Sequence, residues 1–164
     1  MNDTYPFYNT PLLYPYDALE PYIDTKTMEL HHNRHLQTYI DNLNKILEEN
    51  PRLQSFTLKE LLSSWCRLPP ETGIQLRNNA GGVFNHRFYF NSIGPASKPY
   101  ENNFILKEIK RQFNSYDNFK NEFKKAGLSV FGSGYAWLAF MDNNLLIIKT
   151  ANQNTPDLSL YTPV

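Results

Sequence analysis

The hydrophobic periodicity of this 164-residue chain changes once, and that change limits the fold to a combination of helices and strands. Up to about residue 127 the apolar residues recur at the spacing of amphipathic helices. Two strand-like runs then follow, at 135–141 and 145–149, and the turn residues between them are typical of a β-hairpin. Since a two-stranded hairpin is marginal alone, it needs a third strand or a helix to cover it. We therefore expect an α+β fold with a small antiparallel sheet.

Local signals place the helices. The first twenty or so residues interleave prolines with tyrosines, which favours an extended arm packed on a neighbouring surface. A long helix should begin after the N-cap Asp24 and end at Asn50, which precedes a proline. Thr57 and Glu60 have the spacing of a capping box, and a second long helix should span about 70–90.

A proline-rich segment, Gly94–Pro99, is the one clear linker. It predicts an N-terminal arm and helical hairpin domain over 1–93 and a C-terminal α/β domain over 94–164. In the second domain, a helix capped by Asp117 should close at Gly127 before the strands begin.

Composition narrows the class of protein. The formal net charge is zero, so the positive surface typical of nucleic-acid or polybasic membrane binders is missing. The single cysteine, Cys66, excludes an internal disulfide framework and a cysteine-rich zinc site. The N-terminal residues do not resemble a signal peptide, and no segment is apolar for long enough to span a bilayer. We expect a cytoplasmic protein whose partner is a small molecule or a second copy of the chain.

All four histidines fall in two helical stretches, which suggests part of a metal site. His31, His35 and Tyr39 are spaced i, i+4, i+8 and should share one helix face. Such pairs also occur on solvated helices, so spacing alone leaves their role open. His32 points to another side, and we expect it to pack or to form hydrogen bonds.

His86 follows two glycines, Gly81 and Gly82, and lies among aromatic residues that would form a dry shell. Each glycine costs a helix interior about 1 kcal/mol relative to alanine. That cost predicts that another backbone or a ligand comes very close to them.

The chain resembles the iron/manganese superoxide dismutases through six segments in the family's order. These are LYPYDALEP (13–21), MELHHNRH (28–35), QTY (37–39), NNAGGVFNH (78–86), FGSGYAW (131–137) and ANQ (151–153). The resemblance implies a mononuclear manganese or iron ion bound by three histidines, one aspartate and a solvent molecule. His31 and His86 match two of the histidine ligands, whereas His35 matches a residue of the substrate channel and Tyr39 the gateway tyrosine.

The resemblance also bears on the choice of metal. Gln153 matches the manganese-type glutamine that hydrogen-bonds the metal-bound solvent, and Gly82 stands where iron-type enzymes have a glutamine. Manganese is therefore preferred. Trp137 matches an aromatic wall of the site, while Tyr135 and Phe90 replace tryptophans usual in the family.

The family's other two ligands lie in an Asp-x-Trp-Glu-His block that this chain lacks. Asp157 is no substitute, because it matches a variable turn. We expect a C-terminally truncated domain, with the strand at 145–149 left as an unpaired edge. In the family that block also contributes to the homodimer contact, which leaves the homodimer open for this chain.

The leading hypothesis is a superoxide dismutase that acts on superoxide, with two of its four protein ligands, His31 and His86, in the chain. Zinc is redox-silent and cannot support this reaction. The alternative is a catalytically inactive dismutase fragment that binds a metal or a partner weakly. A third hypothesis, a hydrolytic zinc enzyme using His31, His35 and His86, lacks a carboxylate placed as a general base.

Overall fold

The computed structural model describes residues 2–95 and 104–164, which belong to two compact units, Met1–Ala96 and Ser97–Val164. Four residues of the expected linker, 96–99, lie outside the described residues. In chain order the elements are α1 (Thr25–Leu30), a π-helical turn (His31–Leu36), α2 (Gln37–Glu49), a 3-10 turn (Pro51–Leu53), α3 (Leu58–Ser64), a second 3-10 turn (Trp65–Arg67), α4 (Pro70–Ser92), α5 (Phe104–Phe113), α6 (Tyr116–Leu128), β1 (Gly134–Met141), β2 (Asn144–Ala151) and β3 (Thr162–Pro163).

The helices of the first unit begin at the residues that the sequence predicts. The Asp24 carboxylate accepts a hydrogen bond from the Thr27 backbone N–H at 2.9 Å, which satisfies a donor at the start of α1. Thr57 and Glu60 form the predicted capping box of α3. The end of α2 at Asn50 and the long helix from Pro70 are also confirmed.

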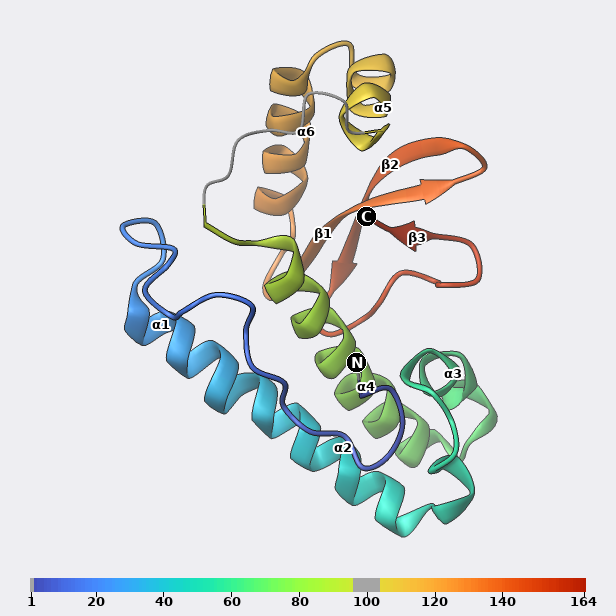
Figure 1. Cartoon of the computed structure of the whole chain (residues 1–164). Helices are drawn as coiled ribbons and strands as arrows, with labels where there is room; N and C mark the ends of the chain where they lie inside the picture. The colour runs from blue at the N-terminus through green and yellow to red at the C-terminus, as the bar shows by residue number, and fades with distance from the viewer. Residues whose placement is uncertain (1, 96–103) are drawn as a thin grey trace. The chain divides into compact units, whose positions relative to one another are not determined.

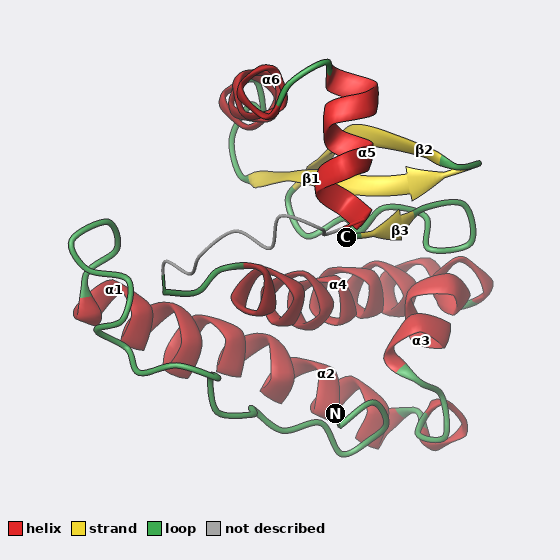
Figure 2. Cartoon of the chain, turned by 45° about the horizontal axis from the view of Figure 1, so that its top comes forward, coloured by secondary structure: helices red, strands yellow, loops and turns green. Residues whose placement is uncertain are grey.

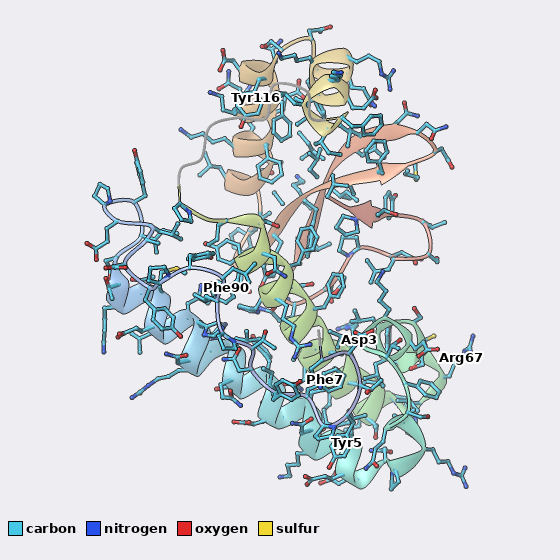
Figure 3. All side chains as sticks on the ribbon, in the orientation of Figure 1. Asp3, Tyr5, Phe7, Arg67, Phe90 and Tyr116 are labelled. Carbon is cyan, nitrogen blue, oxygen red and sulfur yellow. The ribbon has the colours of Figure 1, made fainter. Side chains whose placement is uncertain are left out.

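The first unit is a helical hairpin in which α2 and α4 pack side by side (Figure 1). Leu43, Leu47 and Leu76 are completely buried between the helices. The N-terminal arm runs along this hairpin, and Phe7 of the arm inserts into the core with 2% of its surface exposed (Figure 3). Asn44 of α2 bonds both the N–H and the carbonyl of Phe7, so the arm is received as the sequence predicts.

The second unit is a three-stranded sheet with the order β2-β1-β3, and α5 and α6 pack on one of its faces (Figure 2). β1 and β2 pair antiparallel from Gly134↔Ala151 to Met141↔Asn144. Asp142 and Asn143, the two residues of the turn, have φ values of 49° and 62°. Aspartate and asparagine tolerate this left-handed backbone, so the predicted hairpin is confirmed.

One expectation for the second unit is wrong, and another is confirmed for a different reason. The N-cap of α6 is Ser115, whose hydroxyl accepts a hydrogen bond from the Asn118 N–H, and Asp117 lies inside the first turn. A short third strand does form, and it pairs with β1. The strand order is β2-β1-β3, so β2 is an edge strand of the described sheet although a third strand is present. Among the described helices, none combines the length and the hydrophobicity needed to cross a bilayer.

Candidate metal centre

The hairpin brings the two histidine stretches together. The ring centroids of His31 and His86 are 5.0 Å apart, with the rings almost perpendicular at 87°. His35 lies 4.9 Å and Tyr39 5.3 Å from the His86 ring by the same measure. The predicted stripe of His31, His35 and Tyr39 is therefore confirmed, and it faces His86 across the hairpin.

The first stretch is not a regular α-helix. His31–Leu36 forms a π-helical turn between α1 and α2. A π turn inserts a wider ring into a helix and often occurs at functional sites. No residue of the segment signals it, because β-branched residues, glycine and proline are all absent from 31–36. The wider turn changes the angle at which the three histidines leave the helix, and spacing arguments based on a regular helix missed this feature.

His86 is held in the form that binds metals. Only 2% of its surface is exposed, and its Nδ1 lies 2.7 Å from the Gly82 carbonyl oxygen. A carbonyl only accepts, so Nδ1 carries the proton and Nε2 carries the lone pair. Burial, and secondarily the charges of His31 and His35, lower the pKa of His86 from 6.5 to about 4, against the opposing effect of the Gly82 bond. The ring is thus neutral at neutral pH.

His31 is more open than His86 but has aromatic walls. Its ring lies 5.0 Å from the Phe90 ring and 5.4 Å from the Tyr89 ring, between centroids. Burial first, then the charges of His35 and His32, lower its pKa. Both imidazoles therefore favour the neutral state that a metal ion requires.

A glycine is needed at position 82 for a different reason from the one predicted. A Cβ atom at Gly82 would overlap the ring of Tyr39. The group that approaches this glycine is thus an aromatic side chain, neither a backbone nor a ligand. Gly82 allows the Tyr39 ring to lie close against α4 beside His86.

His32 has the structural role that the sequence predicts. It is buried, its Nε2 donates to the Thr10 carbonyl at 3.0 Å, and its Nδ1 lies 3.0 Å from the Tyr16 hydroxyl. Asn9 donates to the backbone carbonyl of His32. The residue next to His31 is therefore tied to the N-terminal arm.

The remaining predicted site residues lie in the second unit. The Tyr135 hydroxyl donates to Oε1 of Gln153 at 3.0 Å, across the β1–β2 pair. The Trp137 indole N–H donates to the Thr150 hydroxyl at 2.9 Å, and only 4% of Trp137 is exposed. Sequence reasoning treats Tyr135 only as a replacement for tryptophan and misses this hydrogen bond.

The chemistry of the donor set fits the expected metal in part. Imidazole nitrogen is a suitable ligand for manganese and iron, so His31 and His86 fit one side of such a site. Within the described residues, no group of three or more histidine, cysteine, aspartate or glutamate side chains is arranged to hold a metal ion. The hypothesis of a zinc site built from His31, His35 and His86 is therefore wrong for this part of the chain.

Comparisons with known proteins cover both units. The model of the α-hairpin domain of iron/manganese superoxide dismutases matches residues 6–94, and the model of their C-terminal domain matches residues 101–164. Superoxide dismutase [Mn] of Escherichia coli K12 is 43% identical over 150 residues, which cover 91% of this chain and 72% of the relative. Superoxide dismutase [Mn] 2 of Bacillus anthracis is 41% identical, with 88% and 70% covered. Superoxide dismutase [Mn/Fe] 2 of Staphylococcus aureus N315 is 39% identical, with 93% and 75% covered.

Proposed function

Because this chain belongs to the iron/manganese superoxide dismutase family, we propose that it converts superoxide into oxygen and hydrogen peroxide at one manganese or iron ion. Two superoxide ions and two protons give one molecule of each product. The observation that carries the proposal is the pair of neutral imidazoles, His31 and His86, whose ring centroids lie 5.0 Å apart. The metal, when bound, supplies the centre that accepts an electron from one superoxide and returns it to the next.

In this proposal His31 and His86 hold the metal. The Gly82 carbonyl fixes the proton of His86 on Nδ1 and leaves the Nε2 lone pair for coordination. Two imidazoles do not fill the coordination shell of manganese or iron. The resemblance implies a further histidine and an aspartate, so the affinity of these two residues alone should be modest.

We assign proton delivery to Tyr39 and His35. Formation of the peroxide consumes two protons, and the exposed His35 imidazole can exchange its proton with solvent. Its ring lies 5.1 Å from that of Tyr39, which in turn lies beside His86. In this proposal Tyr39 relays the proton from His35 toward the His86 side.

We further propose that manganese is the preferred metal. A glutamine at position 82, as in the iron-type pattern, would overlap the Tyr39 ring in its present position. The resemblance assigns the corresponding amide to Gln153, whose Oε1 accepts a hydrogen bond from the Tyr135 hydroxyl.

A second candidate function is a dismutase-like protein without catalytic activity. The observation that favours it is that, among the residues that the structure describes, no group of three or more potential ligands is arranged to hold a metal ion. Such a protein would bind metal weakly and would not turn over superoxide.

One experiment distinguishes the active dismutase from the inactive protein. The purified chain is loaded with manganese or iron, and the bound metal and the rate of superoxide removal are measured. The proposal predicts about one metal per chain and activity above that of the free ion. His86→Gln should lose the metal, whereas His35→Gln should keep the metal and slow turnover. A folded chain whose activity never exceeds the free-metal background would establish the inactive alternative.

A further inference from the structure

The N-terminal arm is hydrogen-bonded to the π-helical turn between α1 and α2. The side-chain amide of Asn9 donates to the backbone carbonyl of His32 at 2.9 Å. The Nε2 of His32 donates to the carbonyl of Thr10 at 3.0 Å, and the Tyr16 hydroxyl lies 3.0 Å from its Nδ1. The same hydroxyl donates to Oδ1 of Asn33 at 2.7 Å. Three arm residues thus bond the second and third residues of the turn.

These bonds support a helix form that is rare. The turn His31–Leu36 is a π-helix, whereas the elements before and after it are α-helices. Two of its carbonyls take side-chain donors, that of His32 from Asn9 and that of Arg34 from the Thr38 hydroxyl at 2.8 Å. Side chains that bond helix carbonyls distort the hydrogen-bond ladder locally. The arm therefore favours the π form over a regular α-helix.

A second tyrosine of the arm is bonded to the opposite helix. The Tyr14 hydroxyl donates to the carbonyl of Phe90 in α4 at 3.0 Å. The Phe90 ring contacts both imidazoles at the start of the π turn, with centroids 5.0 Å from His31 and 5.3 Å from His32. Phe90 and His32 are both buried. The arm thus bonds α4 and the π turn at the residues on each side of the His31 ring.

We propose that Asn9 and Tyr16 are positioning residues for His31. They hold the backbone and the ring of His32, and so fix the π turn. The turn in its place sets the direction in which the His31 imidazole leaves the helix toward His86. This inference rests on the proposed role of His31 as a metal ligand, but the geometry on which it depends is present in the metal-free chain.

The first test follows the contacts of His31 in the full chain without metal. NMR should show nuclear Overhauser contacts from the His31 ring to the rings of Phe90 and His86. Tyr16→Phe removes one hydroxyl and keeps the ring, and Asn9→Leu replaces the amide by an apolar group of the same branching. Each should weaken both contacts by about threefold or more, because the ring is no longer held in place. Contacts of full strength in both variants would overturn the proposal.

Asn9→Leu also separates positioning from stability. The Oδ1 of Asn9 is buried and has no hydrogen-bond partner among the described residues. Leucine therefore removes an unsatisfied acceptor together with the donor, and these two effects on stability oppose each other. We expect a denaturation midpoint close to that of the unmodified chain, together with weakened contacts of His31.

Asn44→Ala is the matched control at the other end of the arm. Asn44 bonds the N–H and the carbonyl of Phe7 at 2.8 and 2.7 Å, so this variant also loses two bonds to the arm, but none at the π turn. It should keep the contacts of His31. Equal weakening in Asn44→Ala would show that any loosening of the arm has this effect, and would overturn the assignment to Asn9 and Tyr16.

The second test measures the manganese affinity of the same variants. Tyr16→Phe and Asn9→Leu should raise the Kd for Mn²⁺ by about tenfold, as is typical when a group that orients a metal ligand is removed. Asn44→Ala should leave it unchanged. If the unmodified chain binds no manganese, the proposed function fails, and the contacts of His31 in the metal-free chain still decide the positioning role. A chain that binds manganese with the same affinity in both variants would overturn the proposal.

Discussion

The helical hairpin and the sheet unit differ sharply in how much apolar surface they bury. In the hairpin, one cluster unites 15 buried apolar residues from Phe7 to Phe90. In the described part of the sheet unit, the comparably buried apolar residues are Ile109, Trp137, Ala139, Leu145 and Pro156. Hydrophobic burial is the main favourable term in folding, so the hairpin should be the more stable half.

Large exposed apolar side chains occur in both units and do not add to this contrast. Leu13 and Tyr22 of the first unit expose 90% and 91% of their surface. In the sheet unit, Phe131 is fully exposed, and Leu128 and Phe104 expose 77% and 63% of their surface. The histidine pair thus lies in the half with the larger core, where packing fixes its geometry. The packing that positions the two proposed metal ligands, His31 and His86, therefore belongs to the hairpin itself.

The largest effect should come from removing part of the hairpin core. Leu76→Ala deletes a completely buried side chain between α4 and its neighbours, and we expect a loss of about 2–5 kcal/mol in unfolding free energy. Leu160→Ala, at a position 60% exposed in the sheet unit, should change it by about 0.5 kcal/mol or less. Chemical denaturation measures both. Equal losses would contradict the difference between the two halves.

Acid should destabilise the metal-free hairpin. The pKa of folded His86 is about 4 and its ordinary value is 6.5, so the unfolded chain binds the extra proton between these values. This stability is complete above pH 6.5 and is lost as the pH falls toward 4, by about 2–3 kcal/mol. His31 shifts in the same direction and adds to the effect.

Denaturation midpoints between about pH 4 and 7.5, in the presence of a chelator, would show this dependence. His86→Gln should flatten the pH profile of the hairpin transition. An unchanged profile in that variant would show that other groups cause the loss. The sheet unit contains no histidine, so its transition is the internal control.

Replacing one glycine by alanine in each half tests how closely that glycine is packed. Gly82→Ala would place a methyl group in the ring of Tyr39 and should cost about 1–3 kcal/mol. Gly127→Ala on α6 meets only the Cβ of Ala136, at 4.0 Å. This change should be neutral or stabilise by about 0.4–1 kcal/mol, because alanine restricts the unfolded chain. Calorimetry of both variants would detect the opposite signs, and a tolerated Gly82→Ala would show that the Tyr39 ring does not require a glycine at this position.

Local signals in the sequence predict much of the fold. Asp24, the Thr57–Glu60 pair and the turn at Asp142 and Asn143 each act through neighbours within four residues, and each is confirmed. Ser115 was missed because a serine and an aspartate two residues later are both good caps. The sequence alone does not show which one takes the extended backbone.

The candidate site was predicted less completely. The approach of His31 to His86 was expected from the family resemblance, and the π turn at 31–36 was not expected at all. The helix period assumes uniform hydrogen bonding, so it does not reveal where the ladder shifts by one residue. The hydrogen bond from Tyr135 to Gln153 depends on strand register, which the turn residues of the hairpin indicate only approximately.

The smallest expected effects compare equivalent caps in the two halves. Thr57→Ala removes the cap of α3 in the hairpin, and Ser115→Ala removes the cap of α6 beside the sheet. Each should cost its helix about 0.5–2 kcal/mol, because a backbone N–H loses its acceptor. If the halves unfold separately, each variant should reduce the hydrogen-exchange protection of the amides in its own half only. In Ser115→Ala the amides of the sheet unit should therefore exchange before those of the hairpin. A uniform loss of protection across both units in either variant would mean that the chain unfolds as one cooperative body despite its unequal cores.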